Sequence, residues 1–541
     1  MASTRKRGDD PVASHGGVGR SLTRAWRCTI TGGALALALF YVNPAYAQAE
    51  AADIEGNAND DVETASSAED DRPTPIDEPN PEAAGEFTAE AEDDVVVDTS
   101  GGGGLFESAG ASLAADDSSG IAAPSYQLNG HIRGDVFIGK VADRDQSEVK
   151  AGYGELALKL RATGGAYGDA YADFRFRYGA QDSARQLFID AREAYVNAYL
   201  GPLDLRLGQQ VIVWGRADGF NPTNNLNAVD WRIRSPNEDD KRIGNLAARA
   251  FLNFRPLRLE MVWQPFYQAI EFPPIDLPPL VGFGAEVFPP HKLVHSTGAA
   301  RLHLELPAIE MSASYVYGYA PMPGLAFSGL ALGTPTPIHI SRVAYRHQVI
   351  GFDFSTALGD FMAMRGEVAY RRPENYQARH YVPDPDLQYV LGLEKAFGSV
   401  SVIAQYMGRY VFDWAREPGA ALGNLDPSQL ESFSEDVIAN NVNRELARRN
   451  QGLFQQLAQV QHLVSGRVEW LTAHETLSIA AFGMVNLTTE EWLAFPRILY
   501  KISDGLSTTL GAEIYWGPEG TLLDLVENSL TAGYVELKYN F

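Results

Sequence analysis

A phosphate-loop-like stretch and a spaced histidine pair have residue types that could do chemistry. Residues 134–140 read GDVFIGK, which matches the first seven positions of a phosphate-binding loop, but Val141 stands where Ser or Thr must bind Mg²⁺. His291 and His295 are four residues apart in HKLVH, without the adjacent glutamate of a zinc-protease helix. We therefore predict no catalytic, metal-binding or cofactor-binding residue, and no cofactor.

Two further histidines, His462 and His474, leave an enzymatic alternative open. A barrel lipase or peptide hydrolase needs Ser, His and acidic groups that converge only in space, and either histidine could act as its base. Our interpretation is that the chain is not an enzyme, with such a hydrolase as the alternative. The secondary structure that positions the two histidines decides between the non-enzymatic interpretation and the hydrolase.

The N-terminal residues have the features of an export signal. Residues 28–42 form an apolar run after a basic stretch, and this run is too short for a membrane anchor. Ala45 and Ala47 supply the small residues of a cleavage site. The pattern predicts a Sec-type signal peptide at residues 1–47, and its removal takes away the one cysteine, Cys28.

The following segment, residues 48–124, concentrates the acidity of the chain. It carries 21 Asp and Glu against one Arg, within a formal net charge of −25 for the whole sequence. Such a composition predicts a disordered, self-repelling segment, which we place in the periplasm as a spacer. A periplasmic partner for it stays open as an alternative. The acidity argues against nucleic acid as a partner.

From residue 125 onward the polarity alternates with a period of two. In residues 126–138 the even positions are apolar or glycine, and the odd positions are mostly polar or charged. The same alternation recurs at 203–207, 257–264, 362–371 and 535–541. Strands with two unlike faces separate two different solvents.

The lengths of the connections also alternate. Short turns are expected at 200–204, 254–258, 306–310, 357–361, 396–400, 472–476 and 503–507, and long loops at 215–243, 266–294, 320–341, 372–386 and 411–461. Short turns at one end and long loops at the other are typical of a transmembrane β-barrel. We therefore predict an all-β, antiparallel transmembrane barrel of about 16–18 strands at 125–541, with an aqueous lumen.

The side chains expected on the inner wall are polar and of both signs. The candidate lumen-wall residues are Arg133, Arg175, Arg177, Arg206, Gln210, Trp214, Arg365 and Glu367, and further inward charges include Glu260, Asp353, Arg467 and Glu513. These charges either pair across neighbouring strands or form an electrostatic filter. Their near balance favours pairing, and Arg175 and Arg177 are the best candidates for an anion-facing patch.

The stretch VWGRADGFNPTNNLNAVDW follows a predicted strand in which Leu205, Leu207, Val211 and Val213 face lipid. Its Gly, Asn and Asp are turn formers, which argues against a catalytic turn. It is long enough to fold back into the lumen as a constriction. We take Arg216, Asp218 and Asp230 as candidate pore-rim or constriction residues.

Two other loops have their own character. Residues 411–461 have helical spacing after an Asp-Pro cap, so a helix pair there could plug the lumen, cap its mouth or lie in solvent. Residues 266–294 are apolar and Pro-rich. They either pack on themselves over the barrel or form a hydrophobic patch at the pore mouth.

The segment REAYVNAYLGPLDLRLGQQVIVWGRADGFNPTNNLNAVDW resembles part of an uncharacterised family of proteobacterial outer-membrane barrels. It is also distantly similar to alginate-export and long-porin families. The shared residues are Arg206, Gly208, Gln210, Trp214, Gly215, Asn227 and Asp230, and residues 504–521 resemble the near-terminal strand of the family. The resemblance implies a location in the outer membrane and a barrel architecture, without a substrate.

Together these patterns predict a porin-like channel in the outer membrane that passes or exports a solute, such as an amphiphilic compound or a polysaccharide. An adhesin or envelope-linking barrel is the third alternative. The expected partners are outer-membrane lipid and lipopolysaccharide, and the barrel-assembly machinery. That machinery would recognise the terminal strand YVELKYNF, in which Tyr539 and Phe541 belong to an aromatic girdle.

Overall fold

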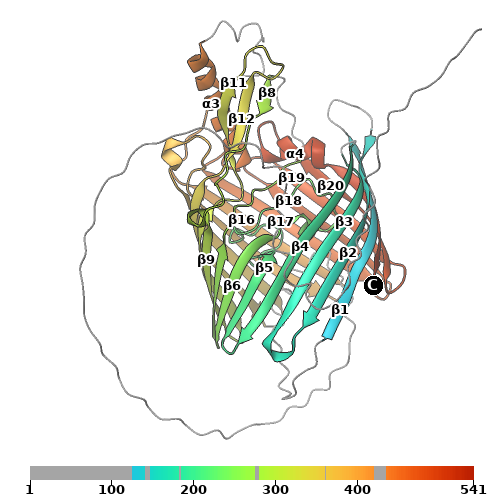
Figure 1. Cartoon of the computed structure of the whole chain (residues 1–541). Helices are drawn as coiled ribbons and strands as arrows, with labels where there is room; N and C mark the ends of the chain where they lie inside the picture. Colours follow the sequence, from blue (N-terminus) through green and yellow to red (C-terminus); the bar gives the residue numbers. More distant parts are fainter. Residues whose placement is uncertain (1–124, 141–146, 182–183, 274–279, 360, 419–433) are drawn as a thin grey trace, which may run out of the picture. The chain divides into compact units, whose positions relative to one another are not determined.

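The computed structural model describes residues 125–140, 147–181, 184–273, 280–359, 361–418 and 434–541. The predicted signal peptide and acidic segment lie outside these residues. Eighteen strands form one antiparallel sheet, and β21 pairs back onto β1, so the sheet closes into a barrel (Figure 1). The barrel strands are β1 (Ser125–Lys140), β2 (Ser147–Thr163), β3 (Gly168–Gln181), β4 (Ala184–Leu200), β5 (Leu203–Gln210), β6 (Asn245–Phe254), β7 (Leu257–Gln264), β9 (Thr297–Glu305), β10 (Ile309–Tyr319), β13 (Arg346–Leu358), β14 (Met362–Pro373), β15 (Asp386–Phe397), β16 (Val400–Val411), β17 (Val460–Thr472), β18 (Leu477–Asn486), β19 (Trp492–Lys501), β20 (Leu506–Trp516) and β21 (Ala532–Asn540).

The two faces of the barrel reverse the usual distribution of polarity. On β1, Ile132 and Val136 are exposed on the outside, whereas Arg133 and Asp135 are buried on the inside. The other strands repeat this alternation, and their outward side chains are largely aliphatic or aromatic. An apolar exterior around a charged interior suits lipid outside and water inside. The predicted transmembrane barrel is confirmed, with eighteen strands.

The connections are unequal at the two ends of the barrel, as predicted. The β2–β3, β4–β5, β6–β7, β9–β10, β13–β14, β15–β16, β17–β18 and β19–β20 connections each have two to four residues. The six longest connections lie at the other end, at 211–244, 265–296, 320–345, 374–385, 412–459 and 517–531. The structural elements that could form a site are therefore carried by the long-loop end.

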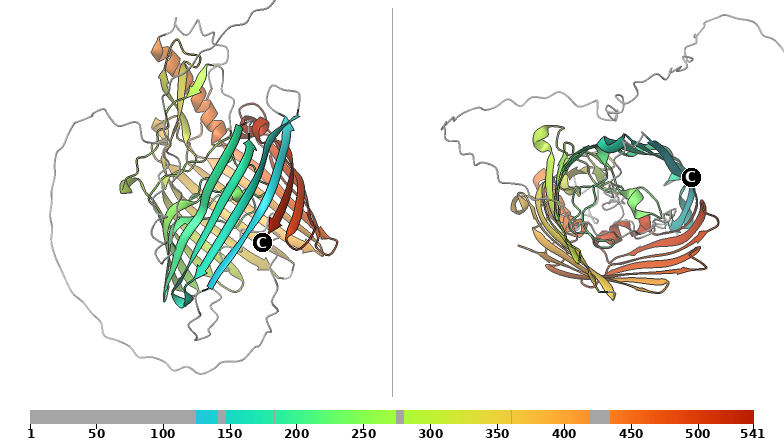
Figure 2. Two further views of the ribbon diagram at one scale, coloured as in Figure 1. Left: turned by 45° about the vertical axis from the view of Figure 1, so that its right-hand side comes forward. Right: turned by 90° about the horizontal axis from the view of Figure 1, so that it is seen from below.

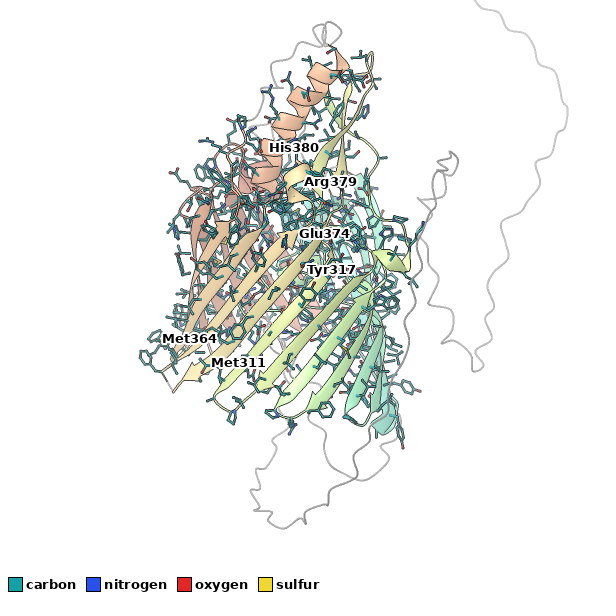
Figure 3. The ribbon with its side chains drawn as sticks, turned by 90° about the vertical axis from the view of Figure 1, so that its left-hand side faces the viewer. Met311, Tyr317, Met364, Glu374, Arg379 and His380 are labelled. Carbon is teal, nitrogen blue, oxygen red and sulfur yellow. The ribbon has the colours of Figure 1, made fainter. Side chains whose placement is uncertain are left out.

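Exposed aromatic side chains mark both ends of the outer wall. Near the short turns these include Phe254, Phe361, Phe397, Trp470, Tyr500, Tyr539 and Phe541, and near the long loops they include Tyr178, Tyr410, Phe412, Trp492 and Trp516. Figure 3 shows Met311 and Met364 near the short-turn end of the wall, and Tyr317 and Glu374 nearer the long loops. Two aromatic belts are typical of a barrel that spans a bilayer.

The ring closes where β21 meets β1. The backbone N–H of Gly130 donates to the Phe541 carbonyl (2.9 Å), and the Phe541 N–H donates to the Gly130 carbonyl (3.0 Å). A Cβ at position 130 would lie 2.9 Å from the Phe541 ring and 2.2 Å from the Ala157 carbonyl oxygen. Only glycine therefore allows this ring to lie across the closing strand pair.

Three long loops build a second, smaller unit at the long-loop end. β8 (Val281–Phe283), β11 (Gly324–Leu330) and β12 (Ile338–Val343) form a three-stranded sheet, in which β12 pairs parallel with β8. Helix α3 (Glu435–Leu453) buries Ile438, Val442 and Leu446 against this sheet. We call the three strands and α3 the apex (Figure 1).

The apex shows where the helical 411–461 loop and the apolar 266–294 loop pack. The predicted helical loop is confirmed by α3, which packs on the small sheet rather than in the lumen. The described residues of this loop contain one helix rather than the expected pair, and the Asp-Pro cap lies outside them. The apolar 266–294 loop supplies β8, so it packs against other loops. The remaining short helices are α4 (Leu522–Leu530), η2 (Gly165–Tyr167), η3 (Glu238–Lys241), η4 (Leu293–His295) and η5 (Tyr376–Ala378). No helix of the described residues is long and apolar enough to cross a membrane.

Candidate constriction site in the barrel lumen

Residues 211–244, between β5 and β6, run inside the barrel, and we call them the lumen loop (Figure 2, right). β5 ends at Gln210, whose buried Nε2 donates to the Ala247 carbonyl (2.9 Å). Strand pairing stops there because the Val211 N–H donates to the Glu193 carboxylate instead (2.9 Å). The expectation that Val211 and Val213 continue the strand toward lipid is therefore wrong.

A carboxylate on β14 pins the first turn of the lumen loop. Glu367 accepts from the backbone N–H groups of Arg216 and Ala217, the latter at 2.6 Å, and from the Thr223 hydroxyl at 3.0 Å. Gly215 has a φ of +106°, and a Cβ there would lie 2.8 Å from a Glu367 carboxylate oxygen. The Trp-Gly pair seen in the sequence thus lets the backbone reach this carboxylate.

Two of the three candidate constriction residues bridge the lumen loop to the wall. Arg216 donates from Nε to Asp353 on β13 (2.8 Å) and from Nη1 to Glu310 on β10 (2.5 Å). Asp218 accepts from both Nε (2.7 Å) and Nη2 (3.0 Å) of Arg467 on β17. These two neighbours in the sequence therefore hold wall strands that are far apart around the ring.

The third candidate, Asp230, lies further along the loop in sequence and forms its ion pair within the loop. Its carboxylate accepts from the Nε (2.9 Å) and Nη2 (2.8 Å) of Arg232. Asn227 nearby joins the two ends of the loop, because its side chain accepts from the Ile212 N–H (2.6 Å) and donates to the Ile243 carbonyl (2.7 Å). Asp230 thus shapes the loop and does not bridge to the barrel wall.

Apolar packing surrounds the first turn. Trp214 is almost fully buried, and its Nε1 donates to Glu260 on β7 (3.2 Å). The indole belongs to a cluster with Ile212 and Leu226 of the loop and with Ala247, Val262, Ala299, Val316, Val349 and Ala369 of the wall. The sequence placed Trp214 on the lumen wall, whereas it belongs to the loop and packs against that wall.

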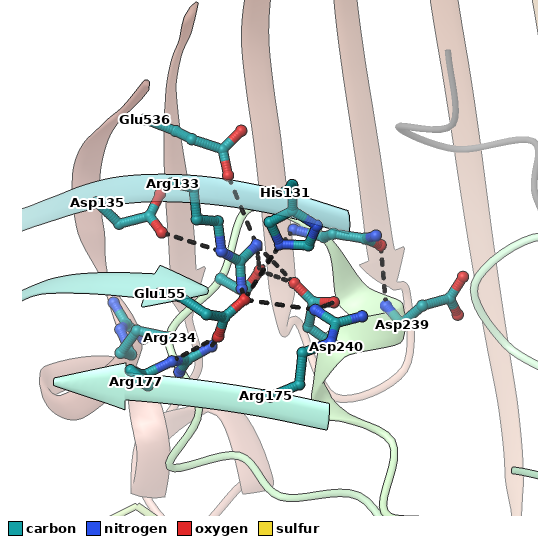
Figure 4. A network of polar contacts seen from close by, with 12 residues as sticks. His131, Arg133, Asp135, Glu155, Arg175, Arg177, Arg234, Asp239, Asp240 and Glu536 are labelled. Carbon is teal, nitrogen blue, oxygen red and sulfur yellow. Dashed lines mark hydrogen bonds and ion pairs between the residues drawn. The ribbon is translucent and has the colours of Figure 1, made fainter. Parts of the chain in front are cut away.

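The second half of the loop enters a cluster of charges on the first strands (Figure 4). Asp240 accepts from Arg133 (2.7 Å) and lies 3.4 Å from Arg175. Glu155 is shared by Arg133 (2.8 Å) and Arg177 (2.6 Å). Since each guanidinium faces a carboxylate, the charges pair across strands, and Arg175 and Arg177 do not form an open anion-facing patch.

The remaining candidate wall residues also have partners on the wall. Arg206 donates to Asn197 (2.7 Å) and stacks over the Tyr195 ring at 4.2 Å. Arg365 lies 2.5 Å from Glu394 on β15. Both are on the inner face, away from the lumen loop contacts given above.

The histidines considered for an enzyme are separated by the length of a strand. His462 lies at the long-loop end of β17, where it stacks on Tyr406 and its Nδ1 is 2.7 Å from the Tyr406 hydroxyl. His474 lies in the short β17–β18 turn at the other end. They cannot contribute to one site. Among the described residues, no group of three His, Cys, Asp or Glu could hold a metal ion.

Sequence reasoning missed the anchors in the second half of the loop. Arg234 and Lys241 both contact Glu513 on β20, at 3.3 Å each, and Asp240 contacts the charge cluster. A local signal existed, because the stretch RSPNEDDKR holds six charged residues within nine positions. Such density of both signs in a loop indicates ion-pair anchoring, here to the inner wall.

The closed sheet, the apolar exterior and the occupied bore define a transmembrane β-barrel with one of its own loops in the lumen. A family model described as a protein of unknown function, DUF1302, matches residues 29–421. The chain belongs to this family. The resemblance to an uncharacterised barrel family is confirmed, whereas no comparison supports the likeness to alginate-export barrels. No curated protein sequence matches the chain.

Several solved structures are similar to this chain at low sequence identity. OccAB3 of Acinetobacter baumannii is 12% identical, with a TM-score of 0.45, over 77% of this chain and 99% of that one. A BenF-like porin from Pseudomonas fluorescens Pf-5 is 10% identical, with a TM-score of 0.47, over 77% and 98%. OccK8 (OprE) of Pseudomonas aeruginosa is 8% identical, with a TM-score of 0.46, over 77% and 98%.

Proposed function

We propose that the protein is an outer-membrane channel that passes a solute, and that the lumen loop forms its constriction. The observation that carries the proposal is a charged loop held across a polar bore by hydrogen bonds and ion pairs. A barrel of eighteen strands is in the size range that leaves an aqueous lumen when no segment fills it. Because the lumen loop is polar and compatible with water, it is better suited to line a path for solutes than to form an apolar core.

The charge of the lumen loop predicts the selectivity of this channel. The loop carries five Arg and Lys and five Asp and Glu, so its formal charge is zero. Arg216 and Asp218, the candidate constriction residues, each face wall groups of opposite charge. A constriction without excess charge discriminates weakly between small anions and cations.

The unequal lengths of the connections predict the orientation of the barrel in the membrane. Bacterial barrels have short periplasmic turns and long extracellular loops. We therefore propose that the apex is extracellular and that residues 48–124 lie in the periplasm, where a partner could bind them. The apolar wall and its aromatic belts would contact outer-membrane lipid and lipopolysaccharide. The strand ending at Phe541 would be recognised by the assembly machinery.

Planar-bilayer recording of the purified full chain tests the proposal. We expect discrete conductance steps and a reversal potential close to zero in a salt gradient. Asp218→Asn should shift the preference toward anions, and Asp504→Asn, in a short turn, should leave it unchanged. Heat-modified gel mobility checks that the wild type and a Glu367→Ala variant are both folded. If neither folded protein gave conductance steps, the channel proposal would be contradicted.

A further inference from the structure

A cavity of about 450 Å³ lies between the apex and the N-terminal end of α4. Its apolar lining comes from three elements that are distant in sequence, namely the small sheet, α3 and α4. The residues that matter here are Val281, Leu325, Ile340, Leu446, Leu453 and Leu525. Pockets of about 300–1,000 Å³ with such walls are the usual size for a small organic ligand.

The three arginines at the rim of this cavity each pair with a carboxylate. Glu445 is buried on α3 and accepts from the half-buried Arg448 (2.7 Å) and Arg449 (2.9 Å). Arg342 on β12 pairs with Glu286 and lies 3.4 Å from Glu271. Because each arginine already faces a carboxylate, a ligand needs no charge of its own to enter.

The floor of the cavity is attached to the lumen loop. The backbone carbonyl of Glu271 accepts from the Trp231 N–H (2.9 Å), and the backbone N–H of Glu271 donates to the Val229 carbonyl (3.0 Å). The Phe272 ring meets the Trp231 ring edge-on, with centroids 5.5 Å apart. Residues 271–272, which line the cavity, thus contact residues 229–231 of the lumen loop.

We propose that this cavity binds a neutral, mainly apolar small molecule at the outer mouth of the barrel. The cavity volume argues for a small molecule and against a protein partner, because a specific protein interface needs on the order of 1,000 Å² of buried surface. Apolar walls supply the binding free energy, and the rim arginines, each paired with a carboxylate, offer no unpaired positive charge to an anionic ligand. The statement that this molecule is the transported solute rests on the proposed function, whereas the binding itself does not.

Titration with the neutral fluorophore 1-aminoanthracene tests the binding. The full chain in lipid nanodiscs should give a saturable rise in emission above that of empty nanodiscs. Leu525→Trp and Leu325→Trp fill the cavity from two opposite walls, and each should weaken the binding by about tenfold or more. Leu332→Trp, on the exposed β11–β12 turn, is the matched control and should bind as the wild type does.

Two results would overturn the inference, given folded barrels by gel mobility. One is a wild-type titration that shows no saturable component. The other is an unchanged affinity in both filled variants, because the dye would then bind elsewhere. Conductance separates this inference from the proposed function. A protein that binds the dye without conducting keeps the cavity site and loses the channel, and one that conducts without binding does the reverse.

Discussion

Replacing Glu367 by alanine tests whether the lumen loop can leave the constriction. Glu367 holds the loop through the N–H groups of Arg216 and Ala217 and through the Thr223 hydroxyl. A hydrogen bond to a charged group contributes about 1.5 kcal/mol at the lower end of its range, so losing three weakens docking by about 4.5 kcal/mol. That free energy corresponds to about a two-thousandfold change in the ratio of docked to undocked loop.

Single-channel recording in planar bilayers measures this change. The Glu367→Ala barrel should show larger steps, or longer periods at the largest step, than the wild type. Glu394→Ala is the matched control, because Glu394 is a wall carboxylate paired with Arg365 on β14 and not with the loop. Equal conductance and open probability in wild type and Glu367→Ala, with both barrels folded, would refute the pinning role.

The conservative change Glu367→Gln separates charge from shape. An amide keeps one accepting oxygen at nearly the same place and loses the negative charge. Neutral hydrogen bonds are roughly half as strong as charge-assisted ones. We therefore expect an open probability between those of the wild type and Glu367→Ala.

Three further outcomes are expected. Gly215→Ala should open the channel in the same direction, because a φ of +106° strains alanine and its Cβ would meet Glu367; Gly134→Ala, with no atom within 4 Å of the added Cβ, should be silent in the same recordings. A cysteine pair at Thr223 and Gly351, where the two Cβ positions are 3.5 Å apart, should form a disulfide that abolishes the large steps of the alanine variant until it is reduced. Burial and two neighbouring carboxylates raise the pKa of Asp384 to about 6, so its ionisation opposes folding of this loop as the pH rises above about 4, and the penalty is complete above pH 6. Hydrogen-exchange protection at 382–384 should therefore fall from pH 4.5 to 7.5 in the wild type, and Asp384→Asn should remove this dependence.

The barrel was predictable because two solvents act on alternate residues. Lipid selects Ile132 and Val136 on one side of β1, and the polar lumen selects Arg133 and Asp135 on the other. This contrast repeats in every strand and needs no knowledge of distant partners. Connections of two to four residues between antiparallel strands are equally local, so seven of the eight short turns were predicted, and the β2–β3 turn was missed.

The interior was harder to predict because its contacts depend on the closed ring. Val211 and Val213 continue the alternation, but side chains of Glu193 and Asn227 accept from the backbone N–H groups of Val211 and Ile212 and end β5 before them. Arg216 and Asp218 were selected as polar loop residues, but their partners lie on strands that become neighbours of the loop only after closure. The apex likewise depends on β8, whose three residues are too few to show a period.

The second half of the lumen loop lies across the junction where the ring closes. Arg234 and Lys241 contact Glu513 on β20, and Asp240 contacts Arg133 on β1, so this stretch reaches both sides of β21. Joining the first and last strands has the largest loop-closure entropy in the barrel. Residues 234–241 therefore act as an internal latch on that junction. We therefore expect substitutions in residues 234–241 to slow assembly of the barrel, and substitutions in residues 212–223 to change its conductance.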